Sequence, residues 1–185
     1  ITDTGNLTVT GTSSFTTSAS NATITLDATN ALASAVTLST TGSSGNATID
    51  NGTTALDIAA STVGGNLVVT AGDSITDSGI ITVGGTASFT TDTTDKLITL
   101  NSQNAITGQI TFSTIGTGGD VILDNGTTAI SLGTIASNAI GGDLSLLTDA
   151  DQTISNAITL GGSGADLTIT VDNANSLTVQ AALTT

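Results

Sequence analysis

Short runs of alternating apolar and polar residues recur along the whole chain. Leu7-Thr8-Val9 and Ile24-Thr25-Leu26 are early examples, and Ile98-Thr99-Leu100 and Leu177-Thr178-Val179 are later ones. A period of two predicts β-strands that bury one face. The runs recur about every 8–12 residues, with Gly, Asn, Asp and Ser between them. The pattern therefore predicts an all-β chain built from many short strands.

The sequence also repeats itself at long range. Ile1-Thr2-Asp3 matches Ile75-Thr76-Asp77, and the hexapeptide DNGTTA stands at both Asp50–Ala55 and Asp124–Ala129. We divide the chain into a first copy at residues 1–74, a second at 75–153 and a partial third at 154–185. The strand spacing never breaks at a linker, so we predict one continuous domain over residues 1–185.

A repeat of this length favours a solenoid, which grows by stacking one coil on the next. The chain has only three Phe and no Trp or Tyr, and coils stacked about 4.8 Å apart leave a narrow interior that aliphatic side chains fill. With about 20–25 residues per coil, one repeat takes about three coils. We predict a right-handed parallel β-helix, since parallel crossovers are right-handed. A sandwich of immunoglobulin-like modules is the alternative, and the missing Pro, Trp and Tyr disfavour it.

The charge of the chain excludes several classes of function. Lys96 is the only cation among 15 acidic residues, and the formal net charge is −14. One cation cannot neutralise a row of phosphates, so we expect no nucleic acid partner and no attraction to anionic membranes. No apolar run approaches the roughly 20 residues of a membrane-spanning helix, so we expect no membrane insertion. The absence of Cys rules out a disulfide scaffold.

Gly-rich segments in the middle of the chain carry a family resemblance. Val63–Gly79 reads VGGNLVVTAGDSITDSG, Ile81–Thr90 reads ITVGGTASFT, and Ile140–Leu146 repeats part of the first segment. These segments resemble the repeats of filamentous-haemagglutinin-type bacterial exoproteins. The resemblance implies a secreted or surface fibre with a right-handed β-helical shaft, used for adhesion or for building a matrix. The amino-terminal secretion domain of that family has no counterpart in this sequence.

One Gly-rich stretch is a candidate calcium site. Gly161, Gly162, Gly164 and Asp166 occupy the Gly and Asp positions of the G-G-x-G-x-D repeat, in which Asp side chains and turn carbonyls bind Ca²⁺ between coils. The match then stops, because Thr168 stands where a large apolar residue is required. An ordinary Gly-rich turn is the alternative. No other cofactor or metal is expected.

Two other motifs have simple explanations in this composition. Thr-x-Thr pairs occur at Thr8/Thr10, Thr23/Thr25 and Thr168/Thr170. Stacked pairs can match an ice lattice, but outward strand positions are polar in any case, and the pairs do not recur at one coil spacing. The five Asn-x-Ser/Thr glycosylation motifs are at Asn6, Asn21, Asn46, Asn51 and Asn125. Chance gives about four in so Ser/Thr-rich a chain.

The residue types needed for catalysis are scarce. The closest acid pairs are Asp92/Asp95 and Asp149/Asp151, and nothing in their surroundings separates an acid from a base, as a glycosidase requires. Without His, Cys or Tyr, the usual nucleophile and base pairs are missing. We therefore predict no enzymatic activity, with a carbohydrate-acting β-helix kept as an alternative.

We interpret the chain as the structural shaft of a bacterial extracellular adhesin or surface fibre, with an ice-binding solenoid as a further alternative. Since the sequence starts at Ile1 and ends on the strand-like Ser176–Thr185, we expect it to be a segment of a longer protein. Its expected partners are further coils or copies of the same shaft, and a host or surface glycan or protein as receptor. The Asp-rich surface is expected to keep separate shafts soluble by repulsion.

DNGTTA is predicted to be a corner rather than a binding site. Asn-Gly readily supplies the positive φ of a tight turn, and Asp50 and Asp124 can accept hydrogen bonds from amides of the turn. With about three coils between them, the two copies are expected on nearby faces of the solenoid.

Overall fold

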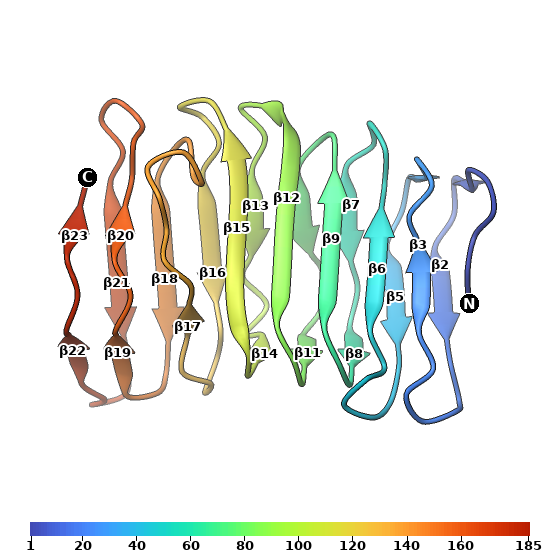
Figure 1. The fold of residues 1–185 in the computed structure, drawn as a ribbon, viewed down its shortest axis with the longest axis horizontal. Helices are drawn as coiled ribbons and strands as arrows, with labels where there is room; N and C mark the ends of the chain where they lie inside the picture. Colours follow the sequence, from blue (N-terminus) through green and yellow to red (C-terminus); the bar gives the residue numbers. More distant parts are fainter.

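A computed structural model describes residues 1–185 as one right-handed β-solenoid of about eight turns. In Figure 1 the chain runs from the N-terminus at the right to the C-terminus at the left. The nearer strands run upwards and the more distant ones downwards, which makes the winding right-handed. This architecture confirms the predicted parallel β-helix and excludes the sandwich alternative.

Twenty-three short strands make up the solenoid, and every paired strand is parallel to its partner. The six-stranded front sheet contains β3 (Ile24–Leu26), β6 (Ala47–Asp50), β9 (Leu67–Ala71), β12 (Ala87–Thr94), β15 (Gln109–Ile115) and β17 (Ser131–Leu132). The eleven-stranded back sheet contains β2 (Ser13–Thr16), β5 (Val36–Ser39), β7 (Leu56–Ile58), β8 (Ser61–Val63), β10 (Ile75–Asp77), β11 (Ile81–Val83), β13 (Ile98–Leu100), β14 (Ala105–Ile106), β16 (Val121–Asp124), β18 (Leu144–Thr148) and β21 (Leu167–Val171). Three further pairs are β1 (Thr8–Val9) with β4 (Ala31–Leu32), β19 (Gln152–Ile154) with β22 (Leu177–Val179), and β20 (Ile158–Thr159) with β23 (Leu183–Thr184). No helix of the structure has the length and hydropathy needed to cross a membrane.

The hydrogen bonds between equivalent positions of neighbouring coils give the coil length directly. Asn46 and Asn66 are joined across 20 residues, Asp120 and Asp143 across 23 residues, and Asp151 and Ser176 across 25 residues. The shortest step in the strand register, from Leu56 to Ile75, lies just below this range. These values agree with the predicted coil of about 20–25 residues.

The sequence repeat and the coil are out of step by half a turn. Three coil steps lead from Ile24 through Ala47 and Leu67 to Ala87, all in the front sheet. Ile98, the counterpart of Ile24 in the second copy, lies half a coil further on, in the back sheet. One repeat therefore spans three and a half coils, not the three that we predicted. The difference arises because two successive coils, from Asn46 to Asn66 and on to Thr86, have only 20 residues each.

The inward side chains of both sheets form one continuous core. It contains 35 buried hydrophobic residues, nearly all Ile, Leu, Val or Ala. Phe89 and Phe112 stack on adjacent coils with their ring centroids 6.0 Å apart. The aliphatic side chains suit a narrow interior because they alternate along each strand and stack on aliphatic neighbours between coils. This core has no break along the solenoid, so the structural features that vary are the corners and the outer faces.

Candidate functional site

The two copies of DNGTTA form tight corners at opposite edges of the solenoid, after β6 and after β16 (Figure 1). The Oδ1 atoms of Asp50 and Asp124 each accept a hydrogen bond of 2.8 Å, from the N–H of Gly52 and of Gly126. Both glycines have positive φ, 54° and 52°, which glycine adopts without a Cβ clash. The predicted corner is confirmed. The expectation of nearby faces is wrong, because the repeat contains an extra half coil.

A fully buried Asn side chain fastens each corner to the preceding coil. Asn51 Oδ1 accepts a hydrogen bond from the N–H of Leu32 at 2.8 Å, and its Nδ2 donates to the Leu32 carbonyl at 3.2 Å. Asn125 binds Ile106 in the same way, at 3.0 and 3.1 Å. Each Nδ2 also donates to carbonyls of its own loop. Each side chain thus replaces a backbone amide in the ladder.

This arrangement separates the five glycosylation motifs into two groups. The side chains of Asn51 and Asn125 are fully buried and their amide groups are engaged, whereas Asn6 and Asn21 are exposed and Asn46 is half-buried. The amide nitrogen of a buried and hydrogen-bonded Asn cannot reach a transferase. Two of the five motifs therefore belong to the fold.

A second type of corner, which was not predicted from the sequence, pairs an Asp with a buried Asn of the next coil. Asp77 accepts a 2.7 Å hydrogen bond from Nδ2 of Asn104 and two more from backbone N–H groups. Asp3 makes the corresponding contact with Asn30 at 2.8 Å. The available signal was the repeated Ile-Thr-Asp with an Asn 27 residues later in both copies.

The candidate calcium residues lie in the turn between β20 and β21. Gly161 and Gly162 pack so closely on the backbone of the preceding coil that neither position has room for a Cβ, and Gly164 has a φ of 80°. Coil packing and turn geometry therefore account for all three glycines. Asp166 lies on the surface, and its N–H donates to Oδ1 of Asp143 at 2.8 Å.

Asp166 is the last member of an acidic ladder on the outside of the solenoid. The N–H of Asp143 donates in turn to Oδ1 of Asp120 at 2.9 Å. In the first copy Asn46 and Asn66 form the corresponding ladder, with an Asn46 Oδ1 to Asn66 N–H bond of 2.8 Å. Nowhere in the structure do three or more His, Cys, Asp or Glu side chains converge as possible metal ligands. Calcium binding thus stays a prediction that rests on the sequence motif alone.

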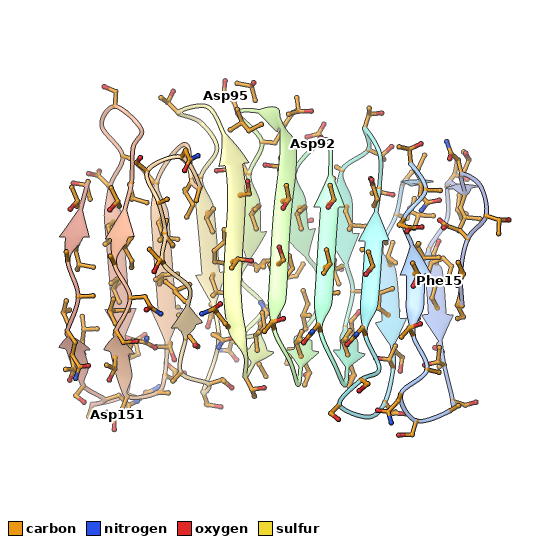
Figure 2. All side chains as sticks on the ribbon, viewed as in Figure 1. Phe15, Asp92, Asp95 and Asp151 are labelled. Atoms are coloured by element: carbon orange, nitrogen blue, oxygen red, sulfur yellow. The ribbon has the colours of Figure 1, made fainter.

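The two acid pairs lie at opposite edges of the solenoid, and one member of each pair accepts hydrogen bonds from the following coil. Figure 2 shows Asp92 and Asp95 at one edge and Asp151 at the other. Asp95 Oδ1 accepts a hydrogen bond of 2.9 Å from the N–H of Gly118. Asp151 Oδ1 accepts two from Ser176, at 2.8 Å from N–H and 2.9 Å from Oγ, and these bonds lower the pKa of Asp151.

The single cation forms the one salt bridge of the chain. Nζ of Lys96 lies 3.0 Å from Oδ1 of Asp73 on the preceding coil. The hydrogen bond from the N–H of Ser74, followed by the interaction with Lys96, lowers the pKa of Asp73. Both side chains are partly exposed, so the pair contributes little to stability.

The outer surface has no enclosed pocket suited to a small molecule. The largest groove has a volume of about 430 Å³ and only one hydrophobic lining residue, whereas ligand pockets are mostly apolar. The groove is lined by Asn6, Thr29, Asn30, Ala31, Asp50, Gly52, Thr53, Thr54 and Asp92. The Thr-x-Thr pairs at Thr8/Thr10, Thr23/Thr25 and Thr168/Thr170 do not meet, because Thr8 is in β1, Thr25 in the front sheet and Thr168 in the back sheet.

A family model matches residues 1–39 and 44–113, which together are more than half of the chain. The family is described as repeats of unknown function (DUF5649). The chain belongs to this family. Searches of curated proteins and of solved structures found no match to the chain.

The DUF5649 match agrees with the geometry of the coils. Its gap, residues 40–43, falls on a loop after β5 that contains Gly42 with a φ of 84°. Within this gap, the Thr40 N–H donates to the Thr62 carbonyl at 2.9 Å and the Thr41 carbonyl accepts from the Asn21 N–H at 2.7 Å, so the coil contacts continue through it. The match includes the first DNGTTA corner and ends before the second, although both corners have the same hydrogen bonds. The family match thus identifies the chain as repeats, and the structure shows that these repeats form a solenoid.

Proposed function

We propose that this chain is a shaft segment of a bacterial extracellular adhesin or of a surface or biofilm-matrix fibre. The observation that carries the proposal is the unbroken core and ladder over about eight turns. Eight coils at about 4.8 Å each hold the two ends roughly 40 Å apart. A solenoid transmits this spacing stiffly, since each coil is fixed to its neighbours along its length.

The composition supports an exported structural role. A net charge of −14 with a single Lys keeps separate shafts apart and soluble. The Gly-rich segments resemble those of filamentous-haemagglutinin-type exoproteins, which use such shafts for adhesion. Asp50 at the first corner and one acid of each pair, Asp95 and Asp151, have structural hydrogen bonds, and we propose no catalytic role and no cofactor. The receptor, a host or surface glycan or protein, is proposed to bind at parts of the protein carried by the shaft.

We further propose that the shaft is continued by further coils or by another copy. Leu177, Val179 and Leu183 of the last coil are 40–46% exposed, whereas the corresponding inward positions of inner coils are buried. Another coil stacked on this edge would cover these side chains and pair the free backbone groups.

Small-angle scattering on the single chain and on two chains fused in tandem tests the shaft. We expect the maximum dimension to increase by roughly 40 Å in the tandem protein, because eight further coils of about 4.8 Å are added, while the cross-section stays constant. A tandem protein that bends at the junction or grows in cross-section would contradict a continuous shaft.

Immunogold labelling of intact and of permeabilised cells tests the surface location. We expect equal labelling of intact and permeabilised cells, because a protein on the outer surface is accessible in both. Labelling that appears only after permeabilisation would contradict a surface location.

A further inference from the structure

Four hydroxyl side chains form a compact patch on the back sheet. Ser14 and Thr16 of β2 pair directly with Thr37 and Ser39 of β5. All four point outwards, because they alternate with inward residues such as Leu38. The patch is a grid with spacings of about 4.8 Å between coils and about 6.8 Å along the strands. We call it the back tetrad.

The front sheet carries the same pattern in the second copy. Ser88 and Thr90 of β12 pair with Thr111 and Ser113 of β15, and these four form the front tetrad. Each is identical in type to its counterpart in the back tetrad, one sequence repeat earlier. Because one repeat spans three and a half coils, the two tetrads lie on opposite faces and about 17 Å apart along the axis.

The eight side chains of the two tetrads are uncharged, on a strongly anionic chain. Acids do border the tetrads: Asp92 follows Thr90 by two residues on the same face of β12, and Asp57 is in β7, which pairs with β5. The repulsion between two copies is therefore weaker across the tetrads themselves than across the Asp-bearing corners.

We propose that neighbouring shafts pack side by side, with the front tetrad of one chain on the back tetrad of a second copy. A hydroxyl group both donates and accepts hydrogen bonds, so two identical tetrads are complementary to each other. A parallel copy displaced by about 17 Å along the axis brings β12 opposite β2 and β15 opposite β5. This inference rests on the proposed shaft function and names the partner of the shaft.

The geometry gives a contact that propagates. Front meets back, so the contact is head-to-tail and each added copy leaves a free tetrad on both sides of the assembly. One tetrad pair replaces hydrogen bonds to water and is weak by itself. Many repeats on one shaft add their contacts by avidity. The result is a flat, staggered array of parallel shafts.

Disulfide trapping tests this packing, and the chain offers a clean background because it has no Cys. The opposed strands run in opposite directions, so Thr90 of one copy faces Ser14 of the next. The experiment mixes the single variants Thr90→Cys and Ser14→Cys of the whole chain under mild oxidation. We expect the mixed dimer to form about tenfold faster than either variant alone, because docking raises the effective concentration of the two thiols.

The control is Thr76→Cys, which is exposed on the back sheet outside the tetrad. The proposal is wrong if Thr90→Cys forms the mixed disulfide with Thr76→Cys as fast as it does with Ser14→Cys. A second arm adds Thr37→Asp to the Ser14→Cys chain, where the new charge should abolish the preference, while circular dichroism shows that the fold is kept. Preferential binding of the tetrads to ice or to a glycan, without chain-to-chain trapping, also overturns it.

If scattering shows a rod but disulfide trapping fails, the proposed lateral packing is wrong while the proposed shaft is unaffected. If the chain is not a rod, the proposed function fails first.

Discussion

Asn side chains have different roles on the inner and the outer side of the solenoid wall. Asn51 and Asn125 face inwards, and each makes hydrogen bonds with both the backbone N–H and the carbonyl of one buried residue, Leu32 or Ile106. Asn66 faces solvent and accepts one bond from the next coil. The Asn-Gly pair predicted the turn but not the buried amide, because a preference for turns does not show which way a side chain points.

The inward Asn side chains should therefore matter far more to stability than the outward ones. For Asn51→Ala and Asn125→Ala we expect a loss of about 1–3 kcal/mol for each buried peptide group left without a partner. For the control Asn66→Ala we expect a change within about 0.5 kcal/mol, since water replaces the lost acceptor. Urea unfolding followed by circular dichroism measures all three. A loss for Asn66→Ala as large as that for Asn51→Ala would contradict the assignment.

Asp151 gives a prediction for acidic pH. Its hydrogen bonds from Ser176 lower the pKa of the folded state below the ordinary value of 3.8. The charged form is thus favoured by folding, so this stabilisation is complete above about pH 3.8 and is lost as the pH falls through the folded-state pKa. We expect Asp151→Asn to lower the melting temperature at pH 7 and to match the native chain at low pH. A difference that stays constant from neutral to strongly acidic pH would count against this explanation.

At the scale of the strand and corner, the spacing of coils constrains the glycines. A Cβ on Gly84 would lie 2.5 Å from the carbonyl oxygen of Gly64 on the preceding coil, whereas a Cβ on Gly11 would meet nothing within 4 Å.

Most inward-facing strand residues were predictable from the alternation of apolar and polar residues. The strands Ser13–Thr16 and Ala47–Asp50 were missed, because Ser and Ala at inward positions give a weak pattern.

The two glycines make a matched pair for mutation. We expect Gly84→Ala to destabilise the chain by about 1–3 kcal/mol through overpacking against the backbone. Gly11→Ala should be neutral or slightly stabilising, because it reduces the entropy of the unfolded chain. Thermal unfolding of both variants checks the difference. Similar effects at the two positions would show that coil contact does not select these glycines.

At the scale of the whole molecule, the sequence predicted the solenoid but not the half coil. The long repeat is visible in the letters, yet the number of coils that it contains depends on coil lengths. These lengths differ, from 20 residues between Asn46 and Asn66 to 25 residues between Asp151 and Ser176. Nothing in a repeat shows where one coil closes on the next. Counterparts such as Thr25 and Thr99 therefore lie on opposite sheets, which only the register reveals.

Distance measurement between spin labels tests the half coil. Labels on Thr25→Cys and Thr99→Cys should be far apart, with about 20 Å between the Cα atoms, since three and a half coils separate them along the axis and the wall-to-wall distance separates them across it. The control pair Thr25→Cys and Thr48→Cys lies on adjacent coils of one sheet, where the expected Cα separation is about 5 Å. If the labels at Thr25 and Thr99 lie on the same face of the solenoid, the half-turn relation between the two copies is wrong.

Each repeat contains an odd number of half coils. The side of the shaft on which the following coils face therefore depends on whether the number of repeats is odd or even. Duplicating or deleting one repeat turns everything downstream to the opposite side of the shaft, while two repeats restore the original direction. The seven coils of a repeat pair are then the shortest length after which the shaft looks the same from one side. Recombination between these related segments would thus change both the length of the shaft and the side on which the coils after them face.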